Sequence, residues 1–215
     1  MYLAIEGVIG VGKTSLVRLL QPLFQAEGLL EVFEENPFLS GFYSDRARYA
    51  FQTQIFFLLS RYHQQRRAVP EALQHGALIA DYTFAKDALF ARINLEGDEL
   101  ELYDNLHNAL AEKIPMPDLI VYLRASTETL MQRIARRDRP YERQMEAAYI
   151  GQLNRAYDDF FSHHAYPPVL TIEAGDLDFV ARGEDLQLIE TQIRSTLKLG
   201  AYQESLPLDK INEHH

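Results

Sequence analysis

The residues best suited to chemistry begin with a glycine-rich stretch near the start of the chain, Gly7-x-x-x-x-Gly12-Lys13-Thr14. Glycines lack a Cβ atom, so backbone N–H groups can converge on phosphate oxygens. The ammonium of Lys13 supplies a charge for the outer phosphates, and the hydroxyl of Thr14 can hold a Mg²⁺ that bridges them. The pattern predicts a nucleoside triphosphate site made of Gly7, Val8, Ile9, Gly10, Val11, Gly12, Lys13, Thr14 and Ser15.

The elements on either side of this stretch have the form that a phosphate loop requires. An apolar run at 2–5 predicts a buried strand, and Leu16, Val17, Leu19 and Leu20 recur at helical spacing after the loop. The N-terminus of such a helix carries a partial positive charge that favours phosphate. Strand, loop and helix together distinguish a phosphate site from an incidental glycine turn.

Strands and helices are expected to alternate along the rest of the chain. Apolar runs predict further strands at 29–33, 77–82, 119–123 and 169–172. Helical spacing predicts helices at 13–25, 45–67, 70–75, 86–95, 98–114, 144–161 and 184–199, and one opening at Ser126. This alternation favours an α/β fold with a five-stranded parallel sheet and helices on both faces. Ligands of such sheets bind outside the carboxyl ends of the strands.

Glycine and proline residues suggest where some elements end. Gly28 is expected to stop the first helix, and Pro22 to disturb its last turns. No linker or internal repeat is recognisable in the sequence. We therefore expect a single domain over 1–199, followed by a polar tail at 200–215.

Overall composition narrows the classes of function. The chain has 215 residues and a formal net charge of −10, which argues against broad nucleic-acid binding because that requires a basic face. It contains no cysteine, so disulfides and thiolate metal sites are excluded. No apolar run approaches the roughly 18 residues of a membrane span. We expect a cytoplasmic protein without a membrane or nucleic-acid partner.

Acidic residues are predicted at the carboxyl ends of two strands. Glu31 lies near the end of the second predicted strand and Asp81 near the end of the third. Phosphoryl transfer to a hydroxyl needs a carboxylate that can accept its proton, and either residue could be that base. Glu34 is a local rival, and Asp81 or Glu34 could instead assist Thr14 in holding the metal. Solvated acids without a function are the alternative, chiefly for Glu34 and Glu35.

A basic cluster stands out against the acidic background. Five guanidinium groups fall within eleven residues, at Arg133, Arg136, Arg137, Arg139 and Arg143. Pro140 predicts that the helix breaks here. An arginine-rich lid that closes over a triphosphate would stabilise the transferring phosphoryl group, whereas a solvated basic loop is the alternative.

Phosphate loops serve several classes of protein, so other motifs must distinguish them. Guanine-reading GTPases carry Asn-Lys-x-Asp and Asp-x-x-Gly, and neither pattern occurs in this sequence. The chain is also short for a motor or a transport ATPase. A small-molecule phosphotransferase is the remaining economical class.

The ordered set of motifs resembles deoxyribonucleoside kinases. The similar segments are 7–15, 31–39, 42–43, 49–54 with Arg61, 80–82 with 86–87, and 133–142. Within that family, Ala-Asp-Tyr at 80–82 and Arg-x-Arg-Pro-(aromatic)-Glu at 137–142 are most similar to bacterial deoxyguanosine kinases. The resemblance implies a P-loop nucleoside/nucleotide kinase fold, ATP and Mg²⁺, and salvage of a purine deoxynucleoside by phosphorylation of its 5′-hydroxyl.

The resemblance also implies roles for individual residues. Glu31 matches the position of the base, and Arg137 and Arg139 match catalytic lid arginines that Arg133 supports at the ATP site. The matching nucleoside-binding positions are Glu31, Tyr43, Gln54, Arg61, Tyr82, Asp87 and Glu142. Among these, Gln54 would read the base edge, and Tyr43 with Glu142 would hold the sugar 3′-hydroxyl. A homodimer is expected, or a heterodimer with a paralogous kinase subunit, through helices 45–67 and 98–114.

One departure from the family leaves alternatives open. Tyr82 stands where much of the family carries an arginine after the acid, which removes a cation near the reacting oxygen. This substitution is the best support for a non-catalytic nucleotide-binding subunit as an alternative. A deoxyadenosine/deoxycytidine kinase and a thymidylate-type monophosphate kinase are further alternatives. The acidic residues Glu31, Glu34 and Glu35 disfavour a monophosphate acceptor, because it is an anion.

Overall fold

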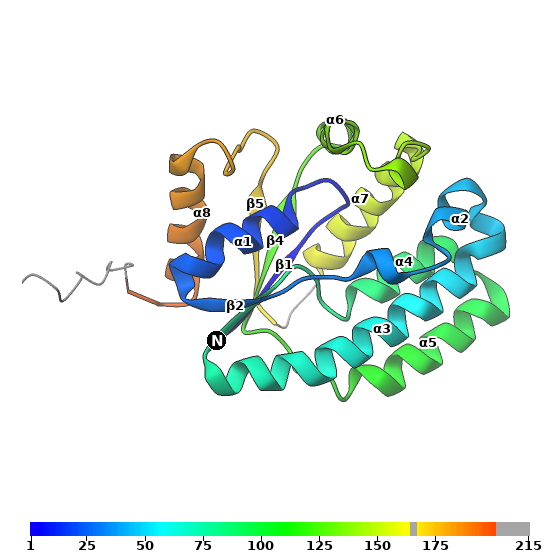
Figure 1. Ribbon diagram of the computed structural model, residues 1–215, viewed down its shortest axis with the longest axis horizontal. Coiled ribbons are helices and arrows are strands. Elements are labelled where there is room, and N and C mark those ends of the chain that lie inside the picture. The colour runs from blue at the N-terminus through cyan, green and yellow to red at the C-terminus, as the bar shows by residue number, and fades with distance from the viewer. Residues whose placement is uncertain (164–166, 201–215) are drawn as a thin grey trace, which may run out of the picture.

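A five-stranded parallel sheet forms the centre of the molecule, as predicted (Figure 1). The computed structural model describes residues 1–163 and 167–200, so the predicted tail beyond Gly200 lies outside the described residues. The strand order is β2-β3-β1-β4-β5. The strands are β1 (Tyr2–Glu6), β2 (Ala26–Leu29), β3 (Ala77–Ala80), β4 (Leu119–Arg124) and β5 (Val169–Glu173).

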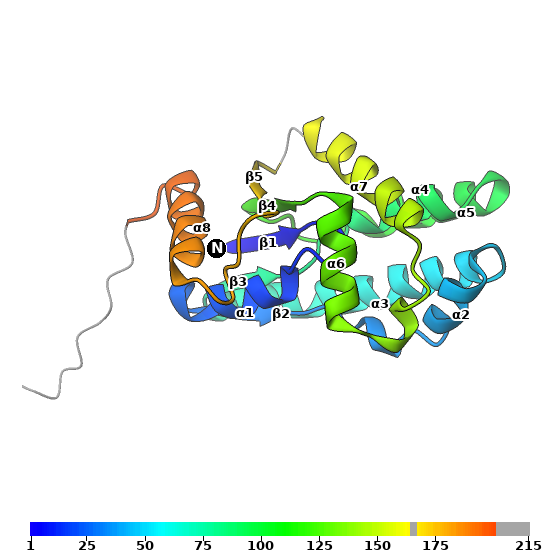
Figure 2. The ribbon, with the colours of Figure 1, turned by 90° about the horizontal axis from the view of Figure 1, so that it is seen from above.

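Helices flank the sheet on both sides. Helix α1 (Lys13–Phe24) and helix α8 (Gly183–Thr196) pack against each other and against the sheet, while α3 (Arg46–His75) and α5 (Gly97–Ala111) lie on the opposite side (Figure 1). The remaining helices are α2 (Leu39–Ser44), α4 (Lys86–Asn94), α6 (Thr127–Arg137) and α7 (Ala147–Ser162), with short 3₁₀ turns η1 (Phe33–Glu35) and η2 (Pro140–Glu142). Figure 2 shows α2, α3, α4, α5 and α7 gathered beyond the end of β1.

The central strands are buried on both faces, which explains their continuous apolar runs. Leu3, Ala4 and Ile5 of β1 have no exposed surface. Ala4 of β1 pairs in register with Ala80 of β3, so both strands end at nearly the same level. The phosphate loop after Glu6 and the acid Asp81 therefore emerge side by side at the carboxyl edge of the sheet.

The second strand lies earlier in the chain than the sequence indicated. It spans Ala26–Leu29 instead of 29–33, so Gly28 belongs to the strand and does not end α1. The helix ends at Phe24, and Gln25 adopts a left-handed φ of 48°. The strand was predicted from the apolar run at 29–33, but Val32 in that run lies in a loop and is 43% exposed. The true strand β2 lies at the edge of the sheet and has exposed residues, so it shows no apolar run.

Helix α3 is continuous over Arg46–His75, although two separate segments were predicted. Pro70 lies within it and removes one backbone hydrogen bond. The flanking Val69 and Ala72 are buried in a cluster with strand residues, and this packing offsets the loss. The cap at Ser126 is confirmed, since its side chain accepts a hydrogen bond from the amide of Thr129 at 3.1 Å. No helix in the described ranges is long and apolar enough to cross a membrane.

Candidate active site

A cavity of about 260 Å³ opens at the carboxyl edge of the sheet. It lies between the phosphate loop, the segment after β2, helices α2, α3 and α4, and the lid at η2. The predicted site residues that line it are Ile9, Gly10, Gly12, Lys13, Thr14, Ser15, Glu31, Tyr43, Gln54, Arg61, Asp81, Arg137, Arg139 and Glu142. Most of the residues singled out in the sequence are therefore brought together.

The phosphate loop has a backbone shape that only glycines adopt readily. Gly7, Gly10 and Gly12 have φ angles of 145°, 89° and 108°. A Cβ atom on Gly7 would lie 2.5 Å from the carbonyl oxygen of Leu123, so a side chain there is excluded by contact as well.

The ammonium of Lys13 is folded back onto its own loop. It donates hydrogen bonds to the carbonyl oxygens of Gly7 at 2.6 Å and Val8 at 3.2 Å. Burial, and then the neighbouring charge of Lys86, lower the pKa of Lys13 to about 8. The loop carbonyls hold the group whose charge a triphosphate would attract.

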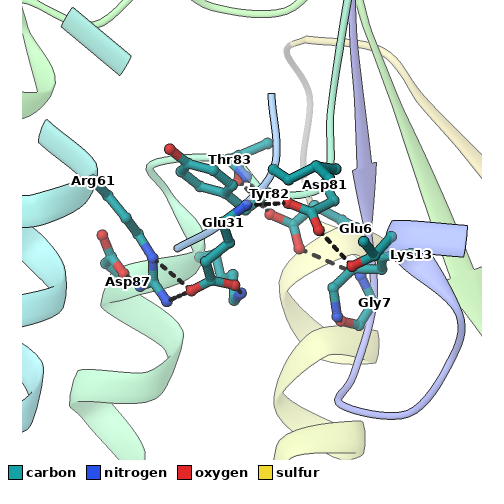
Figure 3. Close-up of polar contacts among 12 residues, drawn as sticks. Glu6, Gly7, Lys13, Glu31, Arg61, Asp81, Tyr82, Thr83 and Asp87 are labelled. Atoms are coloured by element: carbon teal, nitrogen blue, oxygen red, sulfur yellow. Dashed lines mark hydrogen bonds and ion pairs between the residues drawn. The ribbon is translucent and has the colours of Figure 1, made fainter. Parts of the chain in front are cut away.

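Asp81 joins the phosphate loop to the segment after β2 (Figure 3). Its Oδ2 accepts a hydrogen bond from the hydroxyl of Thr14 at 2.6 Å, and its Oδ1 accepts one from the amide of Glu31 at 2.8 Å. Both carboxylate oxygens are thus used to fix the distance between the two sides of the cavity.

The oxygens of Thr14 and Asp81 fit a Mg²⁺, which prefers oxygen ligands and usually relies on substrate phosphates for the others. Within 1–163 and 167–200 there is no group of three metal-binding side chains that could form a complete site. A metal here would depend on the phosphates in the same way. The side chain of Glu34, the other metal candidate, lies outside the described residues.

Glu31 is held by two cations on the other side of the cavity. Its Oε1 accepts hydrogen bonds from the Arg61 guanidinium, and its Oε2 accepts one from Lys86 Nζ at 2.7 Å. Burial alone would raise the pKa of Glu31, but the charges of Arg61 and Lys86 hold it well below its usual value. Arg61 also pairs with the buried Asp87, so it lies between two carboxylates. Glu31 lies two residues beyond β2, not within a strand as predicted.

Aromatic rings and a polar amide line the part of the cavity next to the ion pairs of Glu31. The amide of Gln54 is almost fully buried and faces the cavity. Tyr43 stacks against Tyr141, with ring centroids 6.1 Å apart and an interplanar angle of 17°. The rings of Phe33 and Phe57 complete the walls. Such a mixture suits a flat heterocycle with polar edges.

The lid follows α6, which ends at Arg137 with Asp138 in a left-handed conformation. The Nη2 atom of Arg137 lies 2.7 Å from both oxygens of the buried Glu142. Arg139 places its guanidinium 4.3 Å above the ring of Phe33 and 3.6 Å from Glu142. Arg143, by contrast, pairs with Asp138 on the surface, away from the cavity lining.

Arg133 is placed behind the phosphate loop rather than in the cavity. Its guanidinium donates to the carbonyl oxygens of Val11 at 3.1 Å, Ala174 at 2.8 Å and Leu177 at 3.1 Å. It also lines a second hollow, of about 750 Å³, beside the loop together with Gly12 and Phe179. The contacts tie α6, the loop and the segment after β5 together, which fits the supporting role expected for Arg133.

Two predicted nucleoside-binding residues are separated from the cavity. Tyr82 is 0% exposed, and its hydroxyl donates to Gln64 Oε1 at 2.6 Å. Asp87 is also buried, and it contacts Arg61 from the far side. Any influence of these two residues on a ligand would pass through their neighbours.

Two ionisable groups near the site were not assigned a role from the sequence. Glu6 is completely buried at the end of β1 and accepts hydrogen bonds from the amide and hydroxyl of Thr83 at 2.6 and 2.8 Å. Lys86 lines the cavity and contacts Glu31. The sequence singled out Lys86 only as part of the similar segment 86–87 and gave Glu6 no pattern, so only the tertiary structure reveals what these two residues contact.

Comparisons with known proteins agree with this geometry. A family model described as deoxynucleoside kinase matches residues 3–198. The chain is 35% identical to a deoxyguanosine kinase of Bacillus subtilis (strain 168), over 91% of this chain and 97% of that protein. It is 32% identical to a deoxyadenosine kinase of Dictyostelium discoideum, over 90% of this chain and 80% of that protein.

A solved structure has a closely similar fold. It is a deoxyadenosine kinase from M. mycoides with dCMP and dCDP bound, which is 27% identical to this chain and superimposes with a TM-score of 0.79. The match covers 91% of this chain and all of the other. The family model and this solved structure therefore both match the chain over almost its whole length.

Proposed function

This chain belongs to the deoxynucleoside kinase family, and we propose that it transfers the γ-phosphoryl group of ATP to the 5′-hydroxyl of a purine deoxynucleoside, with deoxyguanosine favoured. One observation carries the proposal. The phosphate loop and the ionised Glu31 face the same cavity, and Asp81 connects them through Thr14 and the amide of Glu31. A phosphoryl donor and a hydroxyl acceptor would therefore meet in one place.

The residues divide the reaction between them. The loop amides and Lys13 hold the triphosphate, and the acceptor oxygen forms a bond to the γ-phosphorus while the bond from that phosphorus to the β,γ-bridging oxygen breaks. The proton of the 5′-hydroxyl passes to Glu31, and ADP leaves. A loose transition state makes little demand on the strength of the base, so a carboxylate of low pKa is adequate when it is well oriented. Mg²⁺, when bound, would neutralise charge on the phosphates beside Thr14 and Asp81.

The geometry supports Glu31 over Asp81 as the proton acceptor. Both oxygens of Asp81 are engaged by Thr14 and by the backbone of Glu31, which suits a structural and metal-side role. The side-chain partners of Glu31 are cations only: its Oε1 accepts two hydrogen bonds from Arg61, whereas its Oε2 accepts one from Lys86 and keeps a second lone-pair site. A hydroxyl can therefore bind Glu31 without displacing its partners.

In this proposal Arg137 and Glu142 act on different substrates. We propose that Arg137, with Arg139, stabilises charge on the transferring phosphoryl group, while Glu142 and Tyr43 bind the sugar 3′-hydroxyl. In the absence of ligand the ion pair between Arg137 and Glu142 satisfies both groups. Binding of both substrates would have to divide this pair.

Selectivity for the base is assigned to the buried amide of Gln54, next to the fixed pair of Arg61 and Asp87. Deoxyguanosine is favoured by the Ala-Asp-Tyr motif at 80–82 and by the 35% identity to a deoxyguanosine kinase. Deoxyadenosine or deoxycytidine phosphorylation is the second candidate. It is favoured by the likeness to a solved deoxyadenosine kinase structure and to a deoxyadenosine/deoxycytidine kinase at 27% identity.

A panel assay tests this proposal. The purified full chain is incubated with ATP, Mg²⁺ and each of the four deoxynucleosides, and with dGMP as a monophosphate acceptor. We expect the highest kcat/KM with deoxyguanosine and no turnover of dGMP. Faster turnover of deoxyadenosine or deoxycytidine would replace the proposed substrate by the second candidate. Absence of turnover with every deoxynucleoside, while ATP still binds, would overturn the catalytic proposal in favour of a nucleotide-binding subunit.

We also propose that the chain forms a homodimer, or a heterodimer with a paralogous subunit, through α3 and α5. The exposed leucines Leu59 and Leu102, 39% and 57% exposed, lie on these two neighbouring helices and support the proposal. Light scattering of the purified chain would give twice the monomer mass, and substitution of both leucines by glutamate would lower it.

A further inference from the structure

The position after Asp81 carries no cation in this protein. Tyr82 occupies it, and its ring lies in a buried cluster with Tyr2, Leu29 and Val69. The Tyr82 hydroxyl donates to Gln64, and the Gln64 amide in turn donates to the carbonyl oxygen of Leu30 at 2.9 Å. Tyr82 therefore supports the backbone that precedes Glu31, but it brings no positive charge to the cavity.

The first residue of α4 brings a cation to the same carboxylate. The ammonium of Lys86 lies 2.7 Å from Glu31 Oε2, and only 5% of the residue is exposed. A charge so thoroughly removed from water is costly to bury unless it is paired, and Glu31 is its partner. Lys86 also lines the cavity, so it faces the space where the substrates would meet.

Lys86 differs from Arg61, the other cation on Glu31. Arg61 lies between Glu31 and Asp87, so two carboxylates balance its charge. Among the described residues, the ammonium of Lys86 has one ion pair, with Glu31. Its field also reaches the phosphate-loop side, because it lowers the pKa of Lys13 and opposes the rise that burial causes in the pKa of Glu6. The ammonium of Lys86 thus acts both on Glu31 and on the ionisable groups beside the phosphate loop.

We propose that Lys86 is a positioning residue for phosphoryl transfer: its ammonium orients the Glu31 carboxylate toward the acceptor hydroxyl and neutralises it against the incoming triphosphate. The inference rests on the proposed function, because it gives Lys86 a task only if Glu31 receives the proton of the acceptor. In this proposal Lys86, at the start of α4, supplies the positive charge that Tyr82 cannot supply.

The reason for such a residue follows from the charges around the cavity. Glu31 and Asp81 place two carboxylates beside the site of a polyanionic substrate, and Arg61 is shared with Asp87. Lys13 must leave its loop carbonyls to bind phosphate, so it cannot also neutralise Glu31. Without Lys86, the Oε2 atom of Glu31 would lose the partner that holds it, and a buried carboxylate with less compensation would face the triphosphate.

The absence of cysteine allows a direct test. Lys86→Cys would contain the only thiol of the chain, and alkylation with 2-bromoethylamine would rebuild an ammonium on a side chain of the same length. Alkylation of the same variant with 1-bromopropane gives a neutral side chain of the same shape. Both reactions are carried out in denaturant before refolding, and the wild-type chain is treated in parallel as a control.

We expect the propyl form to lose about 10²-fold in kcat, the size of effect seen when one preorganised electrostatic contact is removed, and the aminoethyl form to recover most of it. ATP affinity at pH 7 should change little between the two forms, because most of Lys13 is charged there in either case. The acid limb of the profile of kcat/KM against pH should lie at higher pH in the propyl form, because Glu31 then has one cation fewer. The titratable and charged groups that interact with Glu31 are Arg61, Lys86, Lys13, Tyr43, Tyr82 and Tyr157, and Asp81 accepts a hydrogen bond from the Glu31 amide.

The outcomes separate this inference from the proposed function. Equal kcat values and superimposable pH profiles for the two alkylated forms would overturn the role of Lys86 while leaving the kinase proposal standing. Failure of the untreated wild-type chain to phosphorylate any deoxynucleoside, while it still binds ATP, would instead overturn the proposed function. Equal circular dichroism spectra and melting temperatures of the two forms would show that a difference in rate does not come from folding.

Discussion

The two halves of the cavity are built in different ways. The proposed donor half is one contiguous stretch, Gly7 to Ser15, whose proposed phosphate ligands are mostly backbone amides. The acceptor half combines side chains from the segment after β2, from α2, α3 and α4, and from η2. Before any ligand binds, its charges already satisfy one another, with Glu31 against Arg61 and Lys86, and Arg137 against Glu142.

This difference has consequences for how each half responds to change. Backbone ligands are insensitive to most substitutions but depend on the loop conformation, which Gly7, Gly10 and Gly12 make possible. Paired side chains are sensitive one by one, since removal of one partner leaves the other charge buried and uncompensated. We therefore expect the acceptor half and the lid to show the largest effects of single substitutions.

The largest effect is expected for Arg137→Met. Arg137 is the lid residue that we propose stabilises the transferring phosphoryl group, and arginines in that role contribute about 10³-fold or more to kcat. Arg143→Met is a matched control, because Arg143 lies in the same segment but pairs with Asp138 on the surface, where an ion pair contributes little. Steady-state kinetics of both variants test the prediction. Equal losses in the two variants would show that the segment acts through its fold and not through Arg137.

A smaller loss, about 10²-fold in kcat, is expected for Glu31→Gln, because the proposed general base is removed while the shape of the side chain is kept. ATP affinity, measured by calorimetry, should be retained. Glu35→Gln serves as the control, since Glu35 is an exposed acid four residues away. If Glu31→Gln stayed active while Asp81→Asn lost turnover but not ATP affinity, Asp81 would be the base instead.

The donor half should respond to pH through Lys13, whose pKa is lowered to about 8 by burial and by Lys86. Phosphate binds the ammonium form, so ATP affinity should fall as pH rises through this value. The charged fraction drops from about nine tenths at pH 7 to about one tenth at pH 9, which corresponds to roughly tenfold weaker binding.

Calorimetry in buffers of different ionisation enthalpy tests this sign. About one proton should be taken up per nucleotide bound at pH 9, and almost none at pH 7. In Lys86→Met, one cause of the lowered pKa is removed, so the fall in affinity should move to higher pH. Constant affinity from pH 7 to 9 would contradict the prediction.

The smallest effect is expected for Tyr82→Phe, which removes the hydroxyl that donates to Gln64. Loss of one buried hydrogen bond costs about 1 kcal/mol of unfolding free energy, or roughly 2–4 °C in Tm for a chain of this size. The KM for deoxynucleoside should be nearly unchanged, because Tyr82 is buried behind the cavity. A large rise in KM with an unchanged Tm would restore the direct nucleoside contact that the sequence predicted.

Local signals made much of this architecture predictable. The phosphate loop, its strand and its helix are adjacent in the chain, so their periodicity and glycine spacing are visible without any tertiary contact. The cap at Ser126 and the end of α6 before Pro140 were predicted for the same reason. The edge strand β2 was misplaced because its pairing with β3, rather than its own hydrophobicity, makes it a strand.

The amino-acid sequence by itself determined the donor half, since a phosphate site made of backbone amides needs only a short stretch with the right glycines. It also predicted the parallel sheet and indicated the acids Glu31 and Asp81 at its edge. Only the tertiary structure decided the partners of those acids, because the pairs of Glu31 with Arg61 and Lys86 join residues 30 and 55 positions apart. The same is true of Tyr82, whose burial depends on neighbours from β1, β2 and α3 that no local pattern reveals.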